Sequence, residues 1–76
     1  MFPKTAKAIV ETTSAAMVGL RYRHKKTRGT YRVMCVARME ATLELAVVYV
    51  SEKDQVPWVR PLAEFVDGRF AEIKEA

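Results

Sequence analysis

Residues 30 to 50 read Thr-Tyr-Arg-Val-Met-Cys-Val-Ala-Arg-Met-Glu-Ala-Thr-Leu-Glu-Leu-Ala-Val-Val-Tyr-Val, and this stretch decides the fold. Side chains change sides with a period of two along residues 30–38 and again along residues 43–50, as they do in β-strands. Residues 39–42 then form a four-residue connection. The stretch therefore predicts an antiparallel β-hairpin.

The register of this hairpin follows from the four-residue loop. Arg38 is expected to face Leu43, and Arg32 to face Tyr49. Both faces of the hairpin are largely apolar, so we expect one face to close a core and the N-terminal segment or a second subunit to cover the other. The predicted faces of the first strand are Tyr31, Val33, Cys35 and Ala37 on one side and Arg32, Met34, Val36 and Arg38 on the other.

Outside the hairpin, shorter elements complete the fold. Leu62, Phe65 and Val66 fit one helical turn, and the turn signal Asp67-Gly68 precedes the last apolar run. Five short strands with one helical turn before the last predict a mainly β (α+β) fold, a small SH3-like five-stranded barrel. The other expected strands are residues 20–25, 56–60 and 69–73.

The N-terminal segment predicts an amphipathic helix over residues 4–17. Its apolar positions recur every three or four residues, and Gly19 suits its C-terminal stop. We expect a single domain, in which the helix occupies residues 1–18 and the barrel occupies residues 19–76. The apolar stripe is Ala6, Ile9, Val10, Thr13 and Met17.

Length and composition exclude several classes of protein. The chain has 76 residues, half of them hydrophobic, and a single cysteine, Cys35. A secreted chain of this size is typically held by disulfides, and no apolar run approaches the roughly 20 residues that span a bilayer. We therefore expect a cytoplasmic protein that does not bind a membrane, with Cys35 in the core and with no metal site or cofactor.

Positive charge is concentrated in one quarter of the chain. The formal net charge is +4, but residues 20–38 hold seven basic residues and no acidic one, whereas residues 39–76 are net acidic. Such a segment attracts an anionic ligand, an acidic partner or a nucleic acid.

Arginine and aromatic residues recur together in three islands of the sequence, 20–26, 47–49 and 58–65. Trp58 and Arg60 are two apart and share a strand face, where a guanidinium beside an indole can receive an anion. The leading hypothesis is a non-enzymatic module that holds an unknown protein or a small anionic or carboxylate-bearing ligand, as a monomer or a homodimer. The predicted ligand-binding residues are Tyr22, Arg23, His24, Arg38, Tyr49, Trp58 and Arg60.

Two alternatives stay open. Basic residues interleaved with tyrosines are typical of single-stranded nucleic-acid platforms, and a small enzyme or accessory subunit would use His24, the single histidine, as its base. No acidic residue between 12 and 39 is available to orient that base, so catalysis is the weakest class. The candidate nucleic-acid contacts are Arg21, Arg23, Lys25, Lys26, Arg28 and Arg32.

An ordered set of short motifs runs from residue 19 to residue 70. The motifs are Tyr22-Arg23-His24, Ala37-Arg38, Val47-Val48-Tyr49, Trp58-Val59-Arg60-Pro61 with Phe65, and Arg69-Phe70. This set resembles an uncharacterised bacterial family, domain of unknown function 1653. The resemblance implies a small, mostly β fold and supplies no established activity.

Two departures from that family pattern concern its polar residues. After Ala37-Arg38 the family typically carries His-Ser-Glu-Thr, whereas this chain has Met39-Glu40-Ala41-Thr42. Lys25 replaces the aromatic residue that follows the histidine. Any role of that second histidine or serine is therefore absent here.

Overall fold

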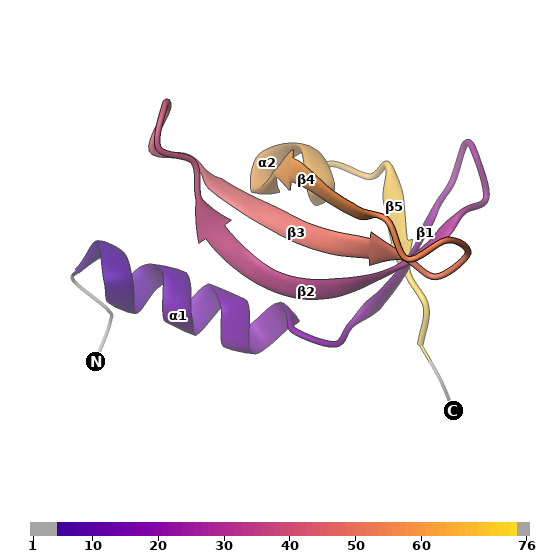
Figure 1. Cartoon of the computed structure of the whole chain (residues 1–76), viewed down its shortest axis with the longest axis horizontal. Coiled ribbons are helices and arrows are strands. Elements are labelled where there is room, and N and C mark those ends of the chain that lie inside the picture. The colour runs from indigo at the N-terminus through magenta and orange to yellow at the C-terminus, as the bar shows by residue number, and fades with distance from the viewer. Residues whose placement is uncertain (1–4, 75–76) are drawn as a thin grey trace.

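The computed structural model describes residues 5–74, which form an N-terminal helix, a one-turn helix and a five-stranded antiparallel sheet (Figure 1). The strand order across the sheet is β4-β3-β2-β1-β5. This α+β architecture, with five strands and a helical turn before the last, confirms the prediction at that level. The elements in chain order are α1 (Ala6–Met17), β1 (Arg21–His24), β2 (Thr30–Arg38), β3 (Leu45–Ser51), β4 (Pro57–Pro61), α2 (Leu62–Phe65) and β5 (Phe70–Glu72).

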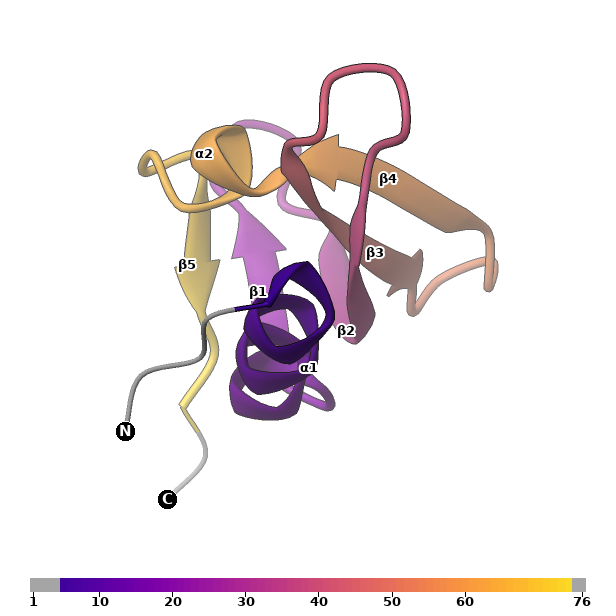
Figure 2. The ribbon, with the colours of Figure 1, turned by 90° about the vertical axis from the view of Figure 1, so that its left-hand side faces the viewer.

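The predicted barrel closure is wrong, because the sheet stays open. Strands β4 and β5 end the sheet on opposite sides, and α2 lies between them (Figure 2). Phe65 of α2 is 1% exposed and stacks on Phe70 of β5 at a centroid distance of 4.4 Å. Side chains, rather than a further ladder of backbone hydrogen bonds, therefore complete the core where a barrel would close.

The helix prediction is confirmed within the described residues; Lys4, its predicted first residue, lies outside them. The Thr5 hydroxyl accepts a hydrogen bond from the Ala8 N–H at 3.0 Å, which caps the first turn. After Met17 the chain reverses at Gly19, whose φ of +84° favours glycine. α1 therefore begins at Ala6, after the Thr5 cap, and ends at Met17 as predicted.

α1 lies along the edge of β2 that β1 leaves open (Figure 1). β1 pairs with β2 only at residues 30–32, and further along β2 the Val36 N–H donates to the Ser14 hydroxyl of α1 at 2.9 Å. Met17 reaches the core. On the sheet face away from that core, Val59 remains 54% exposed, so the helix does not cover the whole of the second apolar face.

The hairpin of β2 and β3 has a different register from the predicted one. Arg38 faces Leu45 and Arg32 faces Val50, because residues 39–44 all belong to the loop. Leu43, the predicted first residue of β3, has a φ of +64° and its N–H donates to the Met39 carbonyl at 2.7 Å. This turn moves the start of β3 by two residues and changes its partners on β2.

A β-bulge at Met34 also changes which side chains face the core. The ladder passes from Val33 opposite Tyr49 to Cys35 opposite Val48, which leaves one extra residue on β2. The predicted faces hold up to Val33 and are reversed afterwards, so Val36 is buried and Cys35 is half-buried on the other face. The core consists of Met17, Val33, Val36, Val47, Tyr49, Phe65 and Phe70.

No helix among residues 5–74 is long and apolar enough to cross a membrane.

Candidate functional site

A small cavity opens where the turn between β1 and β2 meets the start of β4. Its volume is about 190 Å³. Four of the predicted ligand-binding residues line it, and three further residues join them. We call this cavity the aromatic pocket, and its lining is His24, Thr27, Tyr31, Tyr49, Trp58, Arg60 and Phe70.

Strand pairing places the two residues of β4 in the pocket. Tyr49 is paired with Trp58, and Val47 with Arg60, so the side chains of both β4 residues lie on the same sheet face as the buried Tyr49 and Val47. The prediction that Trp58 and Arg60 share a face is confirmed. Trp58 is 51% exposed and therefore forms the rim of the pocket rather than part of the core.

Aromatic contacts hold the pocket walls. Tyr31 meets Tyr49 edge to face at 5.3 Å, and His24 meets Phe70 edge to face at 4.9 Å. Edge-to-face contacts are favoured for aromatic pairs, and the four rings that make these contacts are buried or half-buried. The pocket is thus largely formed before any ligand enters.

Arg60 is the charged group of the pocket. One terminal nitrogen, Nη1, lies 3.3 Å from the Glu64 carboxylate, and the guanidinium lies 5.9 Å from the Phe70 ring centroid. Hydrogen bonding to Tyr49 raises the pKa of Arg60 further above its ordinary value, against the opposing effect of burial. Among residues 5–74, Arg60 Nε is the one buried side-chain nitrogen or oxygen without a hydrogen-bond partner.

A second hollow of about 420 Å³ shares His24 with the aromatic pocket. We call it the cationic groove; His24, Lys25, Lys26 and Arg69 line it. Its shape comes from the turn, in which the Lys25 N–H donates to the Arg69 carbonyl at 2.9 Å. His24 Nδ1 accepts from the Thr27 N–H at 3.3 Å, so this nitrogen is engaged in the turn.

The cations of the groove differ in their partners. Arg69 is neutralised by Asp67, with Nε 2.9 Å from a carboxylate oxygen, and lies 3.8 Å from Glu64. Lys25 and Lys26 are exposed and form no ion pair with any acidic residue in the described part of the chain. The lysines therefore carry the available charge.

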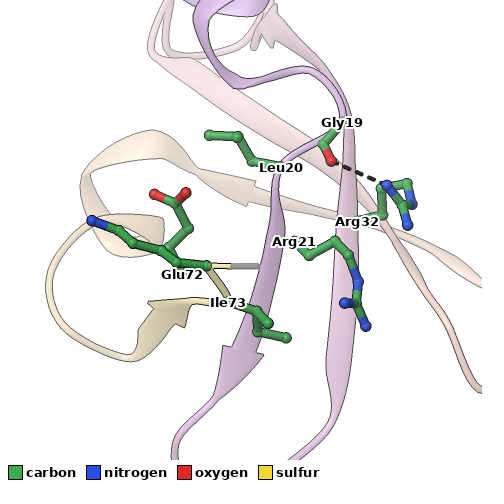
Figure 3. A pocket seen from close by; sticks show the side chains of 7 residues that line it. Gly19, Leu20, Arg21, Arg32, Glu72 and Ile73 are labelled. Atoms are coloured by element: carbon green, nitrogen blue, oxygen red, sulfur yellow. Dashed lines mark hydrogen bonds between the residues drawn. The ribbon is translucent and has the colours of Figure 1, made fainter. Parts of the chain in front are cut away.

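Two of the predicted nucleic-acid contacts, Arg21 and Arg32, pair with an acidic residue of the chain itself. The Glu52 carboxylate accepts two hydrogen bonds from Arg21, each of 2.8 Å, and lies 3.5 Å from Arg32. Chiefly through the bonds from Arg21, this arrangement lowers the pKa of Glu52 to about 2. Figure 3 shows both arginines beside a depression of about 470 Å³, where Arg32 also donates to the Gly19 carbonyl at 3.1 Å.

Three predicted ligand-binding residues lie outside the aromatic pocket. Tyr22 packs edge to face on Phe65 at 4.8 Å, and burial raises the pKa of its hydroxyl. Arg23 is exposed and faces Thr30 and Ala71 across the sheet, while Arg38 donates to the Leu43 carbonyl at 2.8 Å and stabilises the hairpin loop.

Sequence reasoning did not place Thr27, Tyr31 and Phe70 in the site. Tyr31 is the second residue of β2, right after the basic turn, and Phe70 is the first residue of β5, so both lie at the end of the sheet where the turn lies. Their position at strand starts on the core face was the available signal.

A family profile described as a protein of unknown function, DUF1653, matches residues 20–72. The chain belongs to this family. No curated protein and no solved structure matches it. Several motif residues of the DUF1653 domain are core residues, namely Val47, Tyr49, Phe65 and Phe70. Much of the family motif therefore maintains the fold, and the same strands carry Trp58 and Arg60 into the pocket.

Proposed function

We propose that this DUF1653 domain is a non-enzymatic binding module whose aromatic pocket receives a carboxylate or a similar planar anion. The observation that supports it most is Arg60 Nε, a buried donor without an acceptor. A buried polar group without a partner costs about 1–3 kcal/mol, so a movement of the pocket wall that exposes Nε to an acceptor recovers that cost. A carboxylate also matches the planar geometry of a guanidinium.

The charge of the pocket selects the sign of the ligand. Four aromatic rings around a small cavity would otherwise suit a quaternary ammonium group, which binds over ring faces. Arg60 lies over Phe70 and carries the permanent positive charge of a guanidinium. A cation in the pocket would meet this guanidinium, whereas an anion would pair with it.

The volume of the pocket limits how much of a ligand it holds. At about 190 Å³ it is smaller than the roughly 300–1,000 Å³ of pockets that enclose drug-sized ligands. It therefore suits one anionic group of a larger molecule, either an unknown protein partner or a small ligand. We also propose that the module is cytoplasmic. We further propose that its strand order, β4-β3-β2-β1-β5, is that of the SH3-like class.

Trp58 offers a direct readout, since it is the single tryptophan and lies at the pocket rim. We would titrate the protein with benzoate, benzamide and benzamidinium, which share a shape and differ in charge, and follow Trp58 fluorescence. Benzoate is expected to bind, benzamide to bind more weakly, and benzamidinium not to bind. Binding of benzamidinium in preference to benzoate would overturn the proposal.

The matched variant is Arg60→Lys, which keeps the positive charge and removes Nε–H. We expect the benzoate affinity to fall about tenfold, as for the loss of one hydrogen bond to a charged group. The thermal midpoint of the variant shows whether the domain still folds. Unchanged benzoate affinity in a folded Arg60→Lys variant contradicts a role for Nε.

A second candidate function is nucleic-acid binding through the turn between β1 and β2. Of the six predicted contacts, Arg21 and Arg32 pair with Glu52. Arg23, Lys25, Lys26 and Arg28 are exposed and, within residues 5–74, form no ion pair with an acidic side chain. Electrophoretic retardation of single- and double-stranded oligonucleotides at low salt tests it, with affinity expected to fall steeply as salt rises.

A further inference from the structure

The aromatic pocket and the cationic groove are two parts of one surface, because His24 lines both. His24 borders the aromatic pocket, which Arg60 also lines. It also borders the cationic groove, which Lys25 and Lys26 line. A ligand that places one group beside Arg60 and continues past His24 therefore reaches the two lysines.

The positive charges of the aromatic pocket and of the cationic groove are available to a ligand to different degrees. Arg60 is shared with Glu64 through Nη1, yet its Nε has no acceptor. Lys25 and Lys26 are exposed and form no ion pair within the described part of the chain. The surface thus offers one deep and one shallow position for an anionic group.

Acidic residues limit how far this positive surface extends. Asp67 and Glu64 neutralise Arg69 at the far side of the groove. Arg21 and Arg32 are held by Glu52. Beyond the lysines, the turn adds the exposed Arg23 and Arg28. A nucleic-acid strand brings one negative charge with every nucleotide and gains affinity with each phosphate neutralised, so it gains little beyond these few cations.

We infer that the ligand of this surface is a short acidic peptide segment of a partner protein. It places one carboxylate against Arg60 in the aromatic pocket and a second carboxylate against Lys25 and Lys26 in the cationic groove. This inference rests on the proposed function of the pocket. The first carboxylate comes from a side chain or from the C-terminus of the partner, and both sources present the same group.

A synthetic peptide, acetyl-Glu-Glu-Gly-Phe with a free C-terminal carboxylate, tests the two positions by titration against Trp58 fluorescence. Its amidated form lacks the terminal carboxylate, and acetyl-Gln-Gln-Gly-Phe lacks the side-chain carboxylates. The matched protein variant is Lys25→Gln with Lys26→Gln, which removes two exposed charges and leaves the lining of the pocket intact. Benzoate serves as the ligand of the pocket alone.

We expect the double lysine variant to bind the diglutamyl peptide about three- to tenfold more weakly, as for the loss of exposed ion pairs. It should bind benzoate and the diglutaminyl peptide as the unmodified protein does. Weaker binding of the amidated peptide identifies the C-terminus as the group in the pocket, and equal binding identifies a side chain.

Two outcomes overturn the inference while the pocket proposal stands. One is equal affinity of the diglutamyl peptide for the variant and for the unmodified protein. The other is tighter binding of an oligothymidine of about ten nucleotides, a length within the range of one small nucleic-acid-binding domain, with dependence on the same lysines. Failure of benzoate to bind the unmodified protein overturns the pocket proposal itself.

Discussion

Two arginine sites in this small domain differ in whether the chain itself supplies acceptors for the guanidinium group. In the first, Arg21 and Arg32 surround Glu52, and the Arg21 guanidinium makes two hydrogen bonds of 2.8 Å to one carboxylate. In the second, Arg60 lines the aromatic pocket and one of its nitrogens is buried without an acceptor. The first site is complete within the chain, and we propose that a ligand completes the second.

The contrast shows why a run of basic residues does not by itself locate a binding surface. Arg21 and Arg23 are two apart in the sequence, yet Arg21 is tied to the loop between β3 and β4 through Glu52, and Arg23 is exposed. Partners distant in sequence decide which cations remain available. The same reasoning leaves Lys25, Lys26 and Arg28 as the available charges of the turn.

The largest expected effect comes from Glu52→Gln. The pKa of Glu52 is about 2 in the folded protein, against an ordinary value of 4.5. The carboxylate therefore stabilises the fold above its ordinary pKa, and this stabilisation is lost as pH falls from about 5 towards 2. We expect the variant to lose about 2–3 kcal/mol of unfolding free energy at neutral pH, measured by urea denaturation.

The control for that experiment is Glu40→Gln, since Glu40 is an exposed acid in the hairpin loop. Its unfolding free energy should change by less than about 0.5 kcal/mol. A Glu52→Gln variant as stable at neutral pH as Glu40→Gln would show that the arginine cluster is not structural.

The next largest effect is expected from the same substitution, arginine to lysine, made at each of the two arginine sites. Arg21→Lys cannot make the paired bonds to Glu52 and should lose about 1–2 kcal/mol of stability. It should leave the affinity for benzoate unchanged, whereas Arg60→Lys should weaken that affinity about tenfold and change stability little. Denaturation and Trp58 titration of both variants provide the comparison, and equal effects of the two substitutions on benzoate affinity contradict it.

The smallest expected effect is a gain of affinity. Glu64 lies 3.3 Å from Arg60 Nη1 and competes with an anionic ligand for the guanidinium. Because the Glu64 side chain is 48% exposed, its pairing is weak, and Glu64→Gln should raise benzoate affinity about two- to threefold. Glu40→Gln again serves as the control. A loss of affinity on Glu64→Gln would indicate that Glu64 orients Arg60 for binding.

Much of the fold was predictable because local signals and packing agree. The stripe of α1, the turn at Gly19 and the alternation along the hairpin each predicted an element that the structure contains. The hairpin register was not predictable, since a residue in the left-handed region at Leu43 and a bulge at Met34 depend on the folded environment. Closure of the barrel depended on whether Phe65 and Phe70 or a backbone ladder fill the last gap.

Part of the candidate site was also predictable from local signals in the sequence. Trp58 and Arg60 share a face by strand periodicity, so their association was available from the sequence. The absence of Tyr22 and Arg38 from the pocket was not, because each finds a partner on another element or in the hairpin loop. Contacts between elements, rather than residue types, separate structural arginines from those available to a ligand.

Nuclear magnetic resonance of the arginine Nε–H groups compares the two arginine sites, Arg21 and Arg60, in a single experiment. Arg21 Nε already donates to Glu52 at 2.8 Å, while Arg60 Nε has no acceptor. On titration with benzoate, we predict that the Arg60 Nε–H resonance moves downfield in step with the Trp58 fluorescence change, and that the Arg21 resonance stays in place. An Arg60 resonance that stays unmoved when the Trp58 response is saturated would contradict the central claim that the pocket binds an anion through Arg60.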